Sequence, residues 1–252
     1  ISMPRRKWPR RLALGLAAFV AVFLIWLGYI GAFGGQLYFD LPPQRKTPAQ
    51  MDGVAAVVFS GDMGFKVGMG SHIADRLSDA GIPVTGVSSL VYFRTRRSPE
   101  EARDFIREAM NHALRQTGAR KLVLIGQSYG ADMLHVGLAL LPPEERAKIV
   151  LVQLVVPTDT LYFRITPSEL FEWGDPDALA MPTAQLLDWL PVLCVRGQEE
   201  DDSICPRLNH ANVEQLVLPG GHPLHWDSER LGAELLKQIS RTLGTAASPR
   251  GQ

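Results

Sequence analysis

The chain has 252 residues, of which 46% are apolar and 21% charged. This balance is ordinary for a globular domain and argues against a disordered or coiled-coil protein. The formal net charge is +0, but residues 1–39 contain five basic and no acidic groups, which leaves 21 basic and 26 acidic groups in residues 40–252. Such a mildly acidic body gives no reason to expect a nucleic-acid partner. We expect one domain of about 200 residues with an N-terminal appendage.

The appendage is a basic segment, residues 1–11, followed by an uncharged apolar run from Leu12 to Ile30 that extends to Phe33. A run of this length matches the apolar thickness of a bilayer. The basic residues before it place its start in the cytoplasm and the body of the protein outside. We therefore expect residues 12–33 to anchor the protein in the inner membrane, with the body in the periplasm. A cleaved signal peptide is the alternative, although its apolar core is usually shorter, ~7–15 residues.

A polar, proline-bearing linker at residues 34–50 leads to a domain that we place at residues 51–245, followed by a disordered tail at 246–252. Short apolar runs alternate with amphipathic segments in this domain. The expected strands are 54–59, 82–87, 122–125, 149–156, 192–195 and 213–218, and the expected helices are 73–80, 99–116, 131–141 and 228–243. The alternation predicts an α/β fold, in which helices cover both faces of a mostly parallel sheet. Ligands then bind at the carboxyl ends of the strands.

The sequence from Leu122 to Asp132 reads LVLIGQSYGAD, in which Ser128 lies between two glycines after an apolar strand. A Gly-x-Ser-x-Gly pattern between a strand and a helix is typical of a nucleophile elbow. The glycines permit a tight turn, and the following helix directs its first N–H groups at the reacting centre. An ordinary glycine turn is the alternative, but the flanking strand and helix favour Ser128 as a nucleophile.

A nucleophilic serine needs a base, and in this type of fold the order along the chain is serine, acid, histidine. His222 follows two glycines at the end of the expected strand 213–218, so it is the expected base. His225, three residues later, is a weaker candidate. The other histidines lie on expected helices or late loops and are interpreted as ordinary: His72, His112, His135 and His210.

The acid that orients the base is expected in the run Glu199–Asp202, directly after the preceding strand. An acidic run is often only a solvated loop, and one of its carboxylates can reach the histidine. We favour Asp202, with Glu200, three residues after Gly197, as the second choice and Asp201 still open.

An oxyanion hole needs two N–H donors. One is expected from Tyr129, directly after the nucleophile, and the other from Met63 in the loop that follows the first domain strand. Gly61 and Gly64 let that loop approach closely, and Asp62 is expected to hold it in place. An ordinary glycine turn is again the alternative.

The sequence has no HExxH, no CxxC pair and no phosphate-binding Gly-x-x-x-x-Gly-Lys pattern, so we expect no metal or other cofactor. Its two cysteines, Cys194 and Cys205, flank the acidic run and allow one intramolecular pairing. Export would place them in an oxidising compartment. We expect a disulfide, with two unpaired buried thiols as the alternative.

Taken together, these motifs resemble the VirJ/AcvB family of exported bacterial α/β-hydrolase-like proteins, from about Val54 to the C-terminal helix. The resemblance rests on FSGDMGF, GVSSLVYFRTRRSPEEA, IGQSYGADML, EEDDSICP and LPGGH. The chain departs from the family at Met63 and Phe65, where a glycine and a tryptophan are usual, and at Pro223, where a second histidine is usual. These departures affect the pocket and leave the substrate open.

The resemblance implies an α/β-hydrolase fold and hydrolysis of aminoacylated phosphatidylglycerol, either lysyl or alanyl, at the outer face of the inner membrane. It also links some members to virulence and type IV secretion. The acidic run would attract the ammonium group of the substrate, and Arg94, Arg96 or Arg97 would meet its phosphate. The aromatic stretch 161–173 is interpreted as a membrane-facing lid or as extra strands. The alternatives are a periplasmic adaptor that binds a protein partner without catalysis, and a thioesterase or peptidase with the same triad.

Overall fold

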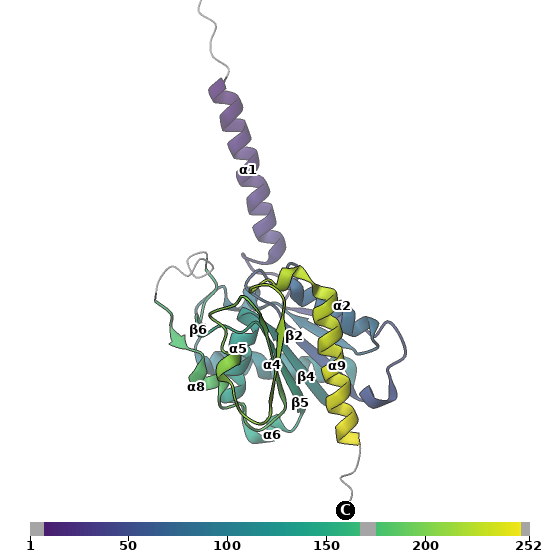
Figure 1. Ribbon diagram of the computed structural model, residues 1–252. Helices are drawn as coiled ribbons and strands as arrows, with labels where there is room; N and C mark the ends of the chain where they lie inside the picture. The colour runs from purple at the N-terminus through teal and green to yellow at the C-terminus, as the bar shows by residue number, and fades with distance from the viewer. Residues whose placement is uncertain (1–7, 167–174, 248–252) are drawn as a thin grey trace, which may run out of the picture.

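The computed structural model describes residues 8–166 and 175–247. A long helix, α1 (Trp8–Ile30), stands away from a domain in which helices pack on both faces of a twisted sheet (Figure 1). The expected α/β fold with a mostly parallel sheet is confirmed, because the sheet is parallel except at one edge.

The sheet has seven strands in the order β1-β3-β2-β4-β5-β8-β9. Each expected strand is present, with ends shifted by up to two residues. The bounds are β1 Tyr38–Leu41, β2 Val54–Phe59, β3 Val84–Val87, β4 Lys121–Gln127, β5 Ile149–Val155, β8 Val192–Gly197 and β9 Val213–Leu218. The central strands are buried on both faces, which explains why they read as continuous apolar runs in the sequence.

Alternate residues of these strands point into two separate cores. One core joins the sheet to α4 (Pro99–Thr117) and α5 (Tyr129–Ala139), and the other joins it to α2 (Met69–Asp79) and α9 (Ser228–Ala247). Phe59 belongs to the first core, whereas Val58 belongs to the second. The register of β2 therefore fixes which helices cover each face.

The expected linker, residues 34–50, is only partly a linker, because residues 38–41 form β1. This strand pairs antiparallel with β3. Asp40 accepts one hydrogen bond from Thr85 Oγ1 at 2.7 Å and lies 2.9 Å from His112 Nε2, and the His112 ring stacks on Tyr38. These polar and stacking contacts hold β1 at the edge of the sheet. The strand therefore lacks the long apolar run by which strands are recognised in a sequence.

Several short elements complete the domain, and most lie in the connections between strands and helices. The bounds are η1 Ala49–Met51, α3 Ser89–Phe93, α6 Pro143–Arg146, β6 Thr160–Leu161, β7 Ala178–Leu179, α8 Met181–Ala184, η2 Cys205–Arg207 and η3 Leu224–Trp226. Strands β6 and β7 pair antiparallel. The aromatic stretch 161–173, interpreted as a lid or as extra strands, therefore starts at the last residue of a short strand. Its residues 167–173 lie outside the described part of the chain.

Two expectations for the chain ends have different outcomes. Helix α9 extends to Ala247, so residues 246 and 247 of the expected tail are helical, and the rest of it lies outside the described residues. Of the expected basic segment 1–11, residues 8–11 already belong to α1, and residues 1–7 are not described. Within α1, the stretch Leu12–Ile30 is long and apolar enough to cross a membrane, and only 6% of it is buried against the domain.

Candidate active site

Ser128 lies at a sharp turn between β4 and α5. Its backbone has φ 54° and ψ −124°, a strained conformation for a residue with a side chain. The turn is possible because Gly126 and Gly130, two residues before and after Ser128, have no side chain. A Cβ at Gly126 would lie 2.5 Å from the Cα of Ala131, and one at Gly130 would overlap the carbonyl oxygens at the end of β2. The two glycines of the Gly-x-Ser-x-Gly pattern are therefore needed because the backbones of β2, β4 and α5 approach closely here, as in a nucleophile elbow.

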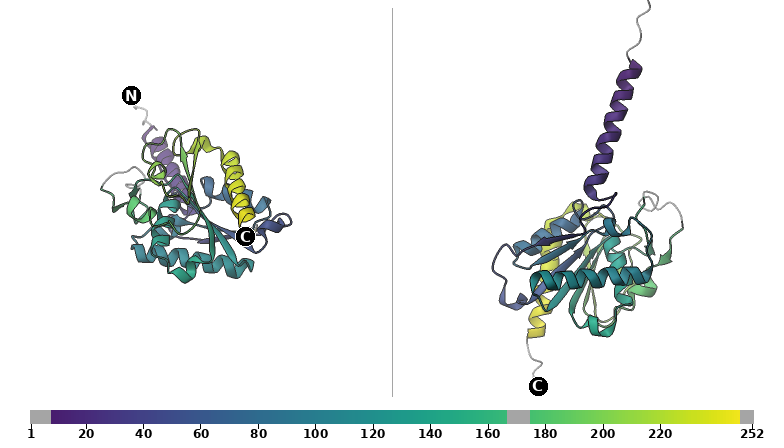
Figure 2. Two further views of the ribbon diagram at one scale, coloured as in Figure 1. Left: turned by 60° about the horizontal axis from the view of Figure 1, so that its bottom comes forward. Right: turned by 180° about the vertical axis from the view of Figure 1, so that it is seen from behind.

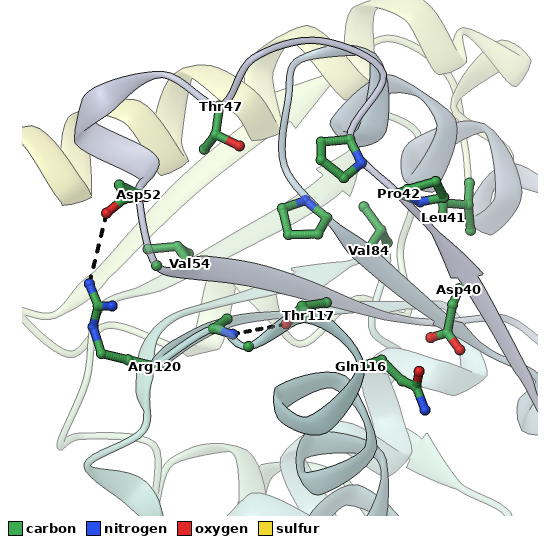
Figure 3. A pocket seen from close by; sticks show the side chains of 15 residues that line it. Asp40, Leu41, Pro42, Thr47, Asp52, Val54, Val84, Gln116, Thr117 and Arg120 are labelled. Carbon is green, nitrogen blue, oxygen red and sulfur yellow. Dashed lines mark hydrogen bonds and ion pairs between the residues drawn. The ribbon is translucent and has the colours of Figure 1, made fainter.

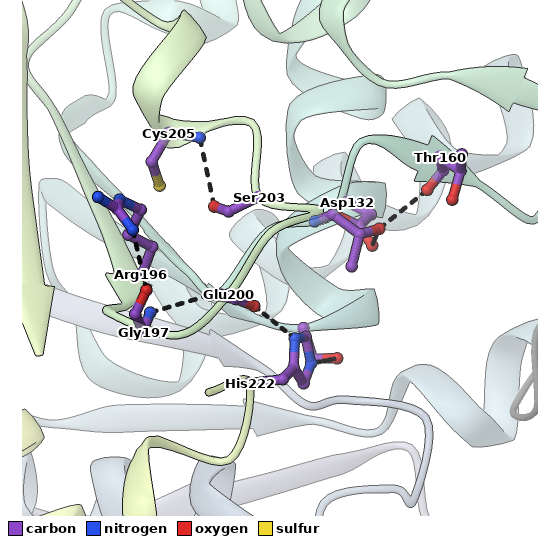
Figure 4. A network of polar contacts seen from close by, with 10 residues as sticks. Asp132, Thr160, Arg196, Gly197, Glu200, Ser203, Cys205 and His222 are labelled. Carbon is purple, nitrogen blue, oxygen red and sulfur yellow. Dashed lines mark hydrogen bonds and ion pairs between the residues drawn. The ribbon is translucent and has the colours of Figure 1, made fainter. Parts of the chain in front are cut away.

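His222 lies between the serine and a buried carboxylate. Its Nε2 is 2.8 Å from Ser128 Oγ, and its Nδ1 is 2.6 Å from Glu200 Oε1. The Glu200 side chain is only 1% exposed, whereas that of His222 is 38% exposed. Figure 4 shows Glu200 between Gly197 and His222, with Gly197 N–H donating to the second carboxylate oxygen, Oε2, at 2.9 Å. The carboxylate is thus held on both oxygens.

This geometry corrects the sequence-based choice of the acid. The carboxylate bonded to His222 is that of Glu200, and not that of Asp202, the first choice from the sequence. The chain turns back after β8, because Glu200 N–H and Gly197 C=O close the turn at 3.4 Å. This turn directs Glu200 inward while Glu199 and Asp201 remain exposed. The spacing of three residues after Gly197 was the signal that the sequence offered for Glu200.

The loop that carries Glu200 is tied at both ends. Cys194 on β8 and Cys205 at the start of η2 form a disulfide across 11 positions of sequence, which confirms the expected pairing. Both cysteines are fully buried. Between them, Ser203 Oγ accepts a hydrogen bond from Cys205 N–H and Ser203 bridges to Thr158 after β5. The acidic run is therefore a constrained loop and not a freely solvated one.

The electrostatic surroundings favour the protonated form of the histidine more than burial opposes it. Burial alone would lower the pKa of His222, but the hydrogen bond and charge of Glu200, with smaller contributions from Asp132 and Asp202, raise it above its usual value. Burial also raises the pKa of Asp62 and brings that of Asp132 to about 8. Burial thus disfavours the charged form of Asp132, and the carboxylate bonded directly to the imidazole is that of Glu200.

Asp132 has a structural position that the sequence analysis did not assign. It lies in the first turn of α5, and its two oxygens accept hydrogen bonds from Thr158 N–H and Thr158 Oγ1, both at 2.9 Å. These bonds join the helix that follows Ser128 to the loop after β5. Gln127 has a similar linking position, since its Oε1 accepts the Gly61 N–H at 3.2 Å. The elbow is thus fastened to both neighbouring loops.

A small pocket of about 170 Å³ opens beside Ser128 and His222. Its walls come from Met63 in the loop after β2, from Met69 at the start of α2, and from Pro223 and Trp226 beyond the histidine. Met63, expected as an oxyanion donor, therefore faces the same space as the serine. Tyr129, the other expected donor, is the first residue of α5, where backbone N–H groups have no acceptor within the helix. Their role as donors remains a prediction.

Larger hollows lie away from this site. A cavity of about 460 Å³ at the amino ends of the central strands is lined by Asp40, Thr47, Gln116 and Arg120 among others (Figure 3). Arg120 there faces Asp52 at 3.9 Å. Because parallel-sheet enzymes bind substrates at the carboxyl ends of their strands, the smaller pocket beside Ser128 is the candidate site.

The remaining sequence candidates are placed as follows. Arg97 pairs with Glu101 and Arg96 with Asp177, so neither is directed at the pocket by these contacts. Arg94 is exposed and donates to the Val91 carbonyl at 3.3 Å. His225 lies in η3 with φ 53° and is not the residue bonded to Ser128. His135 is fully buried against Thr183, and burial lowers its pKa to about 3. Among the described residues, no group of three or more His, Cys, Asp or Glu is arranged to hold a metal.

The fold and the elbow define an α/β-hydrolase. Solved structures agree on the fold at low sequence identity. Est1E from Butyrivibrio proteoclasticus, solved with bound ferulic acid, has a TM-score of 0.56 at 14% identity over 81% of this chain and 95% of its own. XC6422 from Xanthomonas campestris, an α/β serine hydrolase without a lid, has a TM-score of 0.56 at 17% identity over 84% and 90%. Proline iminopeptidase from Mycobacterium smegmatis has a TM-score of 0.55 at 14% identity over 83% and 95%.

The family follows from the sequence. The model of the bacterial virulence protein VirJ matches residues 53–243, so the chain belongs to the VirJ family. This confirms the resemblance drawn from the motifs. No protein with a curated function matches the chain significantly.

Proposed function

We propose that this protein is a serine esterase of the periplasm, held at the inner membrane by α1. The observation that carries the proposal is the continuous pair of hydrogen bonds from Ser128 through His222 to the buried Glu200. Nucleophile, base and orienting acid then stand in the order expected for this fold, with the acid assigned to Glu200.

The proposed reaction uses these three groups in turn. Ser128 Oγ attacks the ester carbonyl carbon, and its proton passes to His222 Nε2. The bond to the leaving oxygen breaks as Nε2 gives that proton to the departing alcohol. Water then attacks the acyl-serine ester, gives a proton to Nε2, and the proton returns to Ser128 Oγ as the free acid leaves. The N–H groups of Met63 and Tyr129 are the proposed donors to the oxyanion in both halves of the reaction.

An ester of a membrane lipid is the proposed substrate. The last turn of α1 contributes Ile30 to the hydrophobic core of the domain, which favours a retained anchor over a cleaved signal. The disulfide fits an exported protein. An enzyme anchored in this way meets lipid esters continuously, whereas a soluble substrate gains nothing from the anchor.

The acyl group is proposed to be an amino acid esterified to phosphatidylglycerol. The family resemblance implies this substrate, and two features of the site are compatible with it. The pocket of about 170 Å³ is small, which suits an aminoacyl group better than a long acyl chain. The charges of Glu200 and Asp202 near His222 favour a substrate that carries an ammonium group.

The test is hydrolysis by the purified full chain in vesicles that contain lysyl- or alanyl-phosphatidylglycerol. We expect free amino acid to appear, and we expect Ser128→Ala to abolish its release. Ser128→Ala should leave the thermal unfolding midpoint almost unchanged, which separates loss of the nucleophile from loss of the fold.

The outcomes separate the competing functions. Equal release by the wild type and Ser128→Ala would contradict an enzyme that uses this serine. Absence of hydrolysis of any ester, including a short activated acyl ester, would favour the adaptor that binds a periplasmic protein. Hydrolysis of a thioester or of an N-terminal peptide bond, without hydrolysis of the lipid, would support a thioesterase or peptidase that uses the same triad and would contradict the lipid substrate.

A further inference from the structure

The base of α1 is packed against the end of the domain that holds the active site. Ile30 is 7% exposed and shares a hydrophobic core with Val87 and Leu90, at the carboxyl end of β3 and in α3. Its carbonyl oxygen lies so close to Gly64 that a Cβ there would approach it to 2.6 Å. Gly64 belongs to the loop after β2 whose neighbours Gly61, Asp62 and Met63 line the pocket beside Ser128.

Further contacts fix the direction in which α1 leaves the domain. A Cβ at Gly31 would lie 2.7 Å from Val91 Cγ2, so the chain passes directly over α3. The Lys66 ammonium lies 4.8 Å from the centre of the Tyr29 ring, a cation–π distance. The helix is therefore attached on two sides, to α3 and to the loop after β2, and is not a flexible tether.

Exposed aromatic and basic side chains lie at this end of the domain. Tyr29 is 57% exposed, Phe33 65% and Trp226 61%, and Trp226 also lines the pocket with Ser128 and His222. Lys66 and Arg94 are exposed, with Arg94 beside Gly34 just after the helix. Figures 1 and 2 show the start of α9, which follows Trp226, close to the base of α1, while the C-terminal end of α9 lies at the opposite end of the domain.

We propose that this end of the domain rests on the outer headgroup layer of the bilayer that α1 spans, with the Ser128 pocket opening at the membrane surface. We call the surface formed by Tyr29, Phe33, Lys66, Arg94 and Trp226 the membrane-contact face. The inference deepens the proposed function but depends only on α1 being a membrane span and on its attachment to the domain.

The dimensions and the chemistry of the face match a lipid surface. Leu12–Ile30 has 19 residues, which at 1.5 Å per residue extends roughly 28 Å and fills the apolar core of about 30 Å. Tyr29 and Phe33 then lie at the boundary with the headgroups, where aromatic rings are enriched in membrane proteins. Lys66 and Arg94 lie at the level of the lipid phosphates, which complement their charge. Because these basic and aromatic groups lie beside the end of a helix that can span a membrane, the proposed partner is the bilayer and not a second protein.

The experiment measures which part of the domain touches lipid. The full chain carrying Trp226→Cys is labelled with an environment-sensitive fluorophore and reconstituted into vesicles of phosphatidylethanolamine and phosphatidylglycerol, some of which bear a spin label at the headgroup. The native cysteines are in a disulfide and do not react. The matched control is Gln116→Cys, an exposed position beside the cavity at the opposite ends of the strands.

We expect quenching by the labelled lipid to be several-fold greater at position 226 than at position 116. Adding Lys66→Glu and Arg94→Glu should reduce the quenching at position 226 in the anionic vesicles. Equal quenching at the two positions, or none at position 226, would overturn the proposal and leave the face to a protein partner. All measurements are repeated with Ser128→Ala, so the result does not depend on whether the protein hydrolyses anything.

Discussion

Two hydrogen bonds determine which nitrogen of His222 can accept a proton. Nδ1 faces Glu200 Oε1, an acceptor when ionised, so the proton of the neutral imidazole belongs on Nδ1. Nε2 is then an acceptor directed at Ser128 Oγ. The hydrogen bond from Gly197 N–H to the second oxygen of Glu200 restrains rotation of the carboxylate. The backbone turn from Gly197 to Glu200 thus sets the tautomer of His222.

Replacing this acid therefore has a specific consequence. In Glu200→Gln, the amide oxygen can keep the Gly197 N–H bond, and the amide NH₂ then donates to Nδ1 and moves the imidazole proton to Nε2. We expect turnover to fall by about two to four orders of magnitude with the fold retained. Asp202→Asn is the control and should be mild; the reverse pattern would return the role to Asp202.

The same variant has a distinct pH signature. The base works only when His222 is neutral, so activity falls as the pH drops through its pKa. Glu200 raises that pKa, and removing its charge should lower it. The residual activity of Glu200→Gln should therefore persist to lower pH than that of the wild type. A pH–rate profile of kcat/KM measures the shift, and a shift toward higher pH would contradict the assignment.

Sequence reasoning brought Ser128 and His222 together, as they lie in the structure, but placed Glu200 second to Asp202 as the carboxylate beside the histidine, and the reason is physical. A strand–elbow–helix sequence and a histidine after a Gly-Gly pair restrict the backbone strongly, so each points to one residue. Four adjacent carboxylates differ only in the direction that a loop gives them. That direction depends on the turn at Gly197 and on the bridge between Thr158 and Ser203. Thr158 and Ser203 are about 45 positions apart in the sequence, so a local pattern cannot reveal their contact.

At the scale of elements, the polar segments were the hardest to predict. The buried strands follow from local patterns, and so does helix α4, whose first turn carries a capping box formed by Ser98 and Glu101. Strand β1 has four residues and no buried one, and it is held by Asp40, Thr85 and His112 across the sheet edge. A strand stabilised by such distant partners leaves no periodic signal in its own sequence.

The Glu200 loop is the element whose stability bears most directly on the site. The disulfide closes a loop of 11 positions, for which the chain-entropy model gives about 3 kcal/mol. We expect Cys194→Ala with Cys205→Ala to lower the free energy of unfolding of the full chain by about this amount, measured in detergent by urea denaturation. Activity should fall under conditions where the variant is still folded, because Glu200 loses its fixed position.

A thiol titration of the denatured, unreduced wild type checks the premise of that experiment. No free thiols are expected. Two free thiols per chain would show that the bond is absent in the isolated protein, and activity unchanged in the folded double variant would show that the bond does not position Glu200.

At the scale of the whole molecule, α1 is packed directly against the loops beside Ser128. Ile30, at the end of α1, packs against the loop that lines the pocket, through Gly64. A helix that merely tethers the domain would tolerate bulk at this joint. A helix that orients the pocket toward the lipid would not, because a small shift at the base of α1 tilts the whole domain against the membrane.

Glycine substitutions in the anchor separate tethering from orientation. In Gly31→Val the new side chain collides with Val91, and the valine backbone would have to keep the φ of 99° that glycine adopts. We therefore expect α1 to detach from α3 while it remains in the membrane. Gly15→Val is the matched control, because a Cβ at Gly15 meets nothing within 4 Å. We expect Gly31→Val to hydrolyse a short soluble ester normally but to release amino acid from aminoacylated phosphatidylglycerol vesicles several-fold more slowly, whereas Gly15→Val should match the wild type in both assays. If Gly31→Val were slowed equally on the soluble ester, the joint would support the catalytic loop itself; if it were slowed on neither, the anchor would act only as a tether.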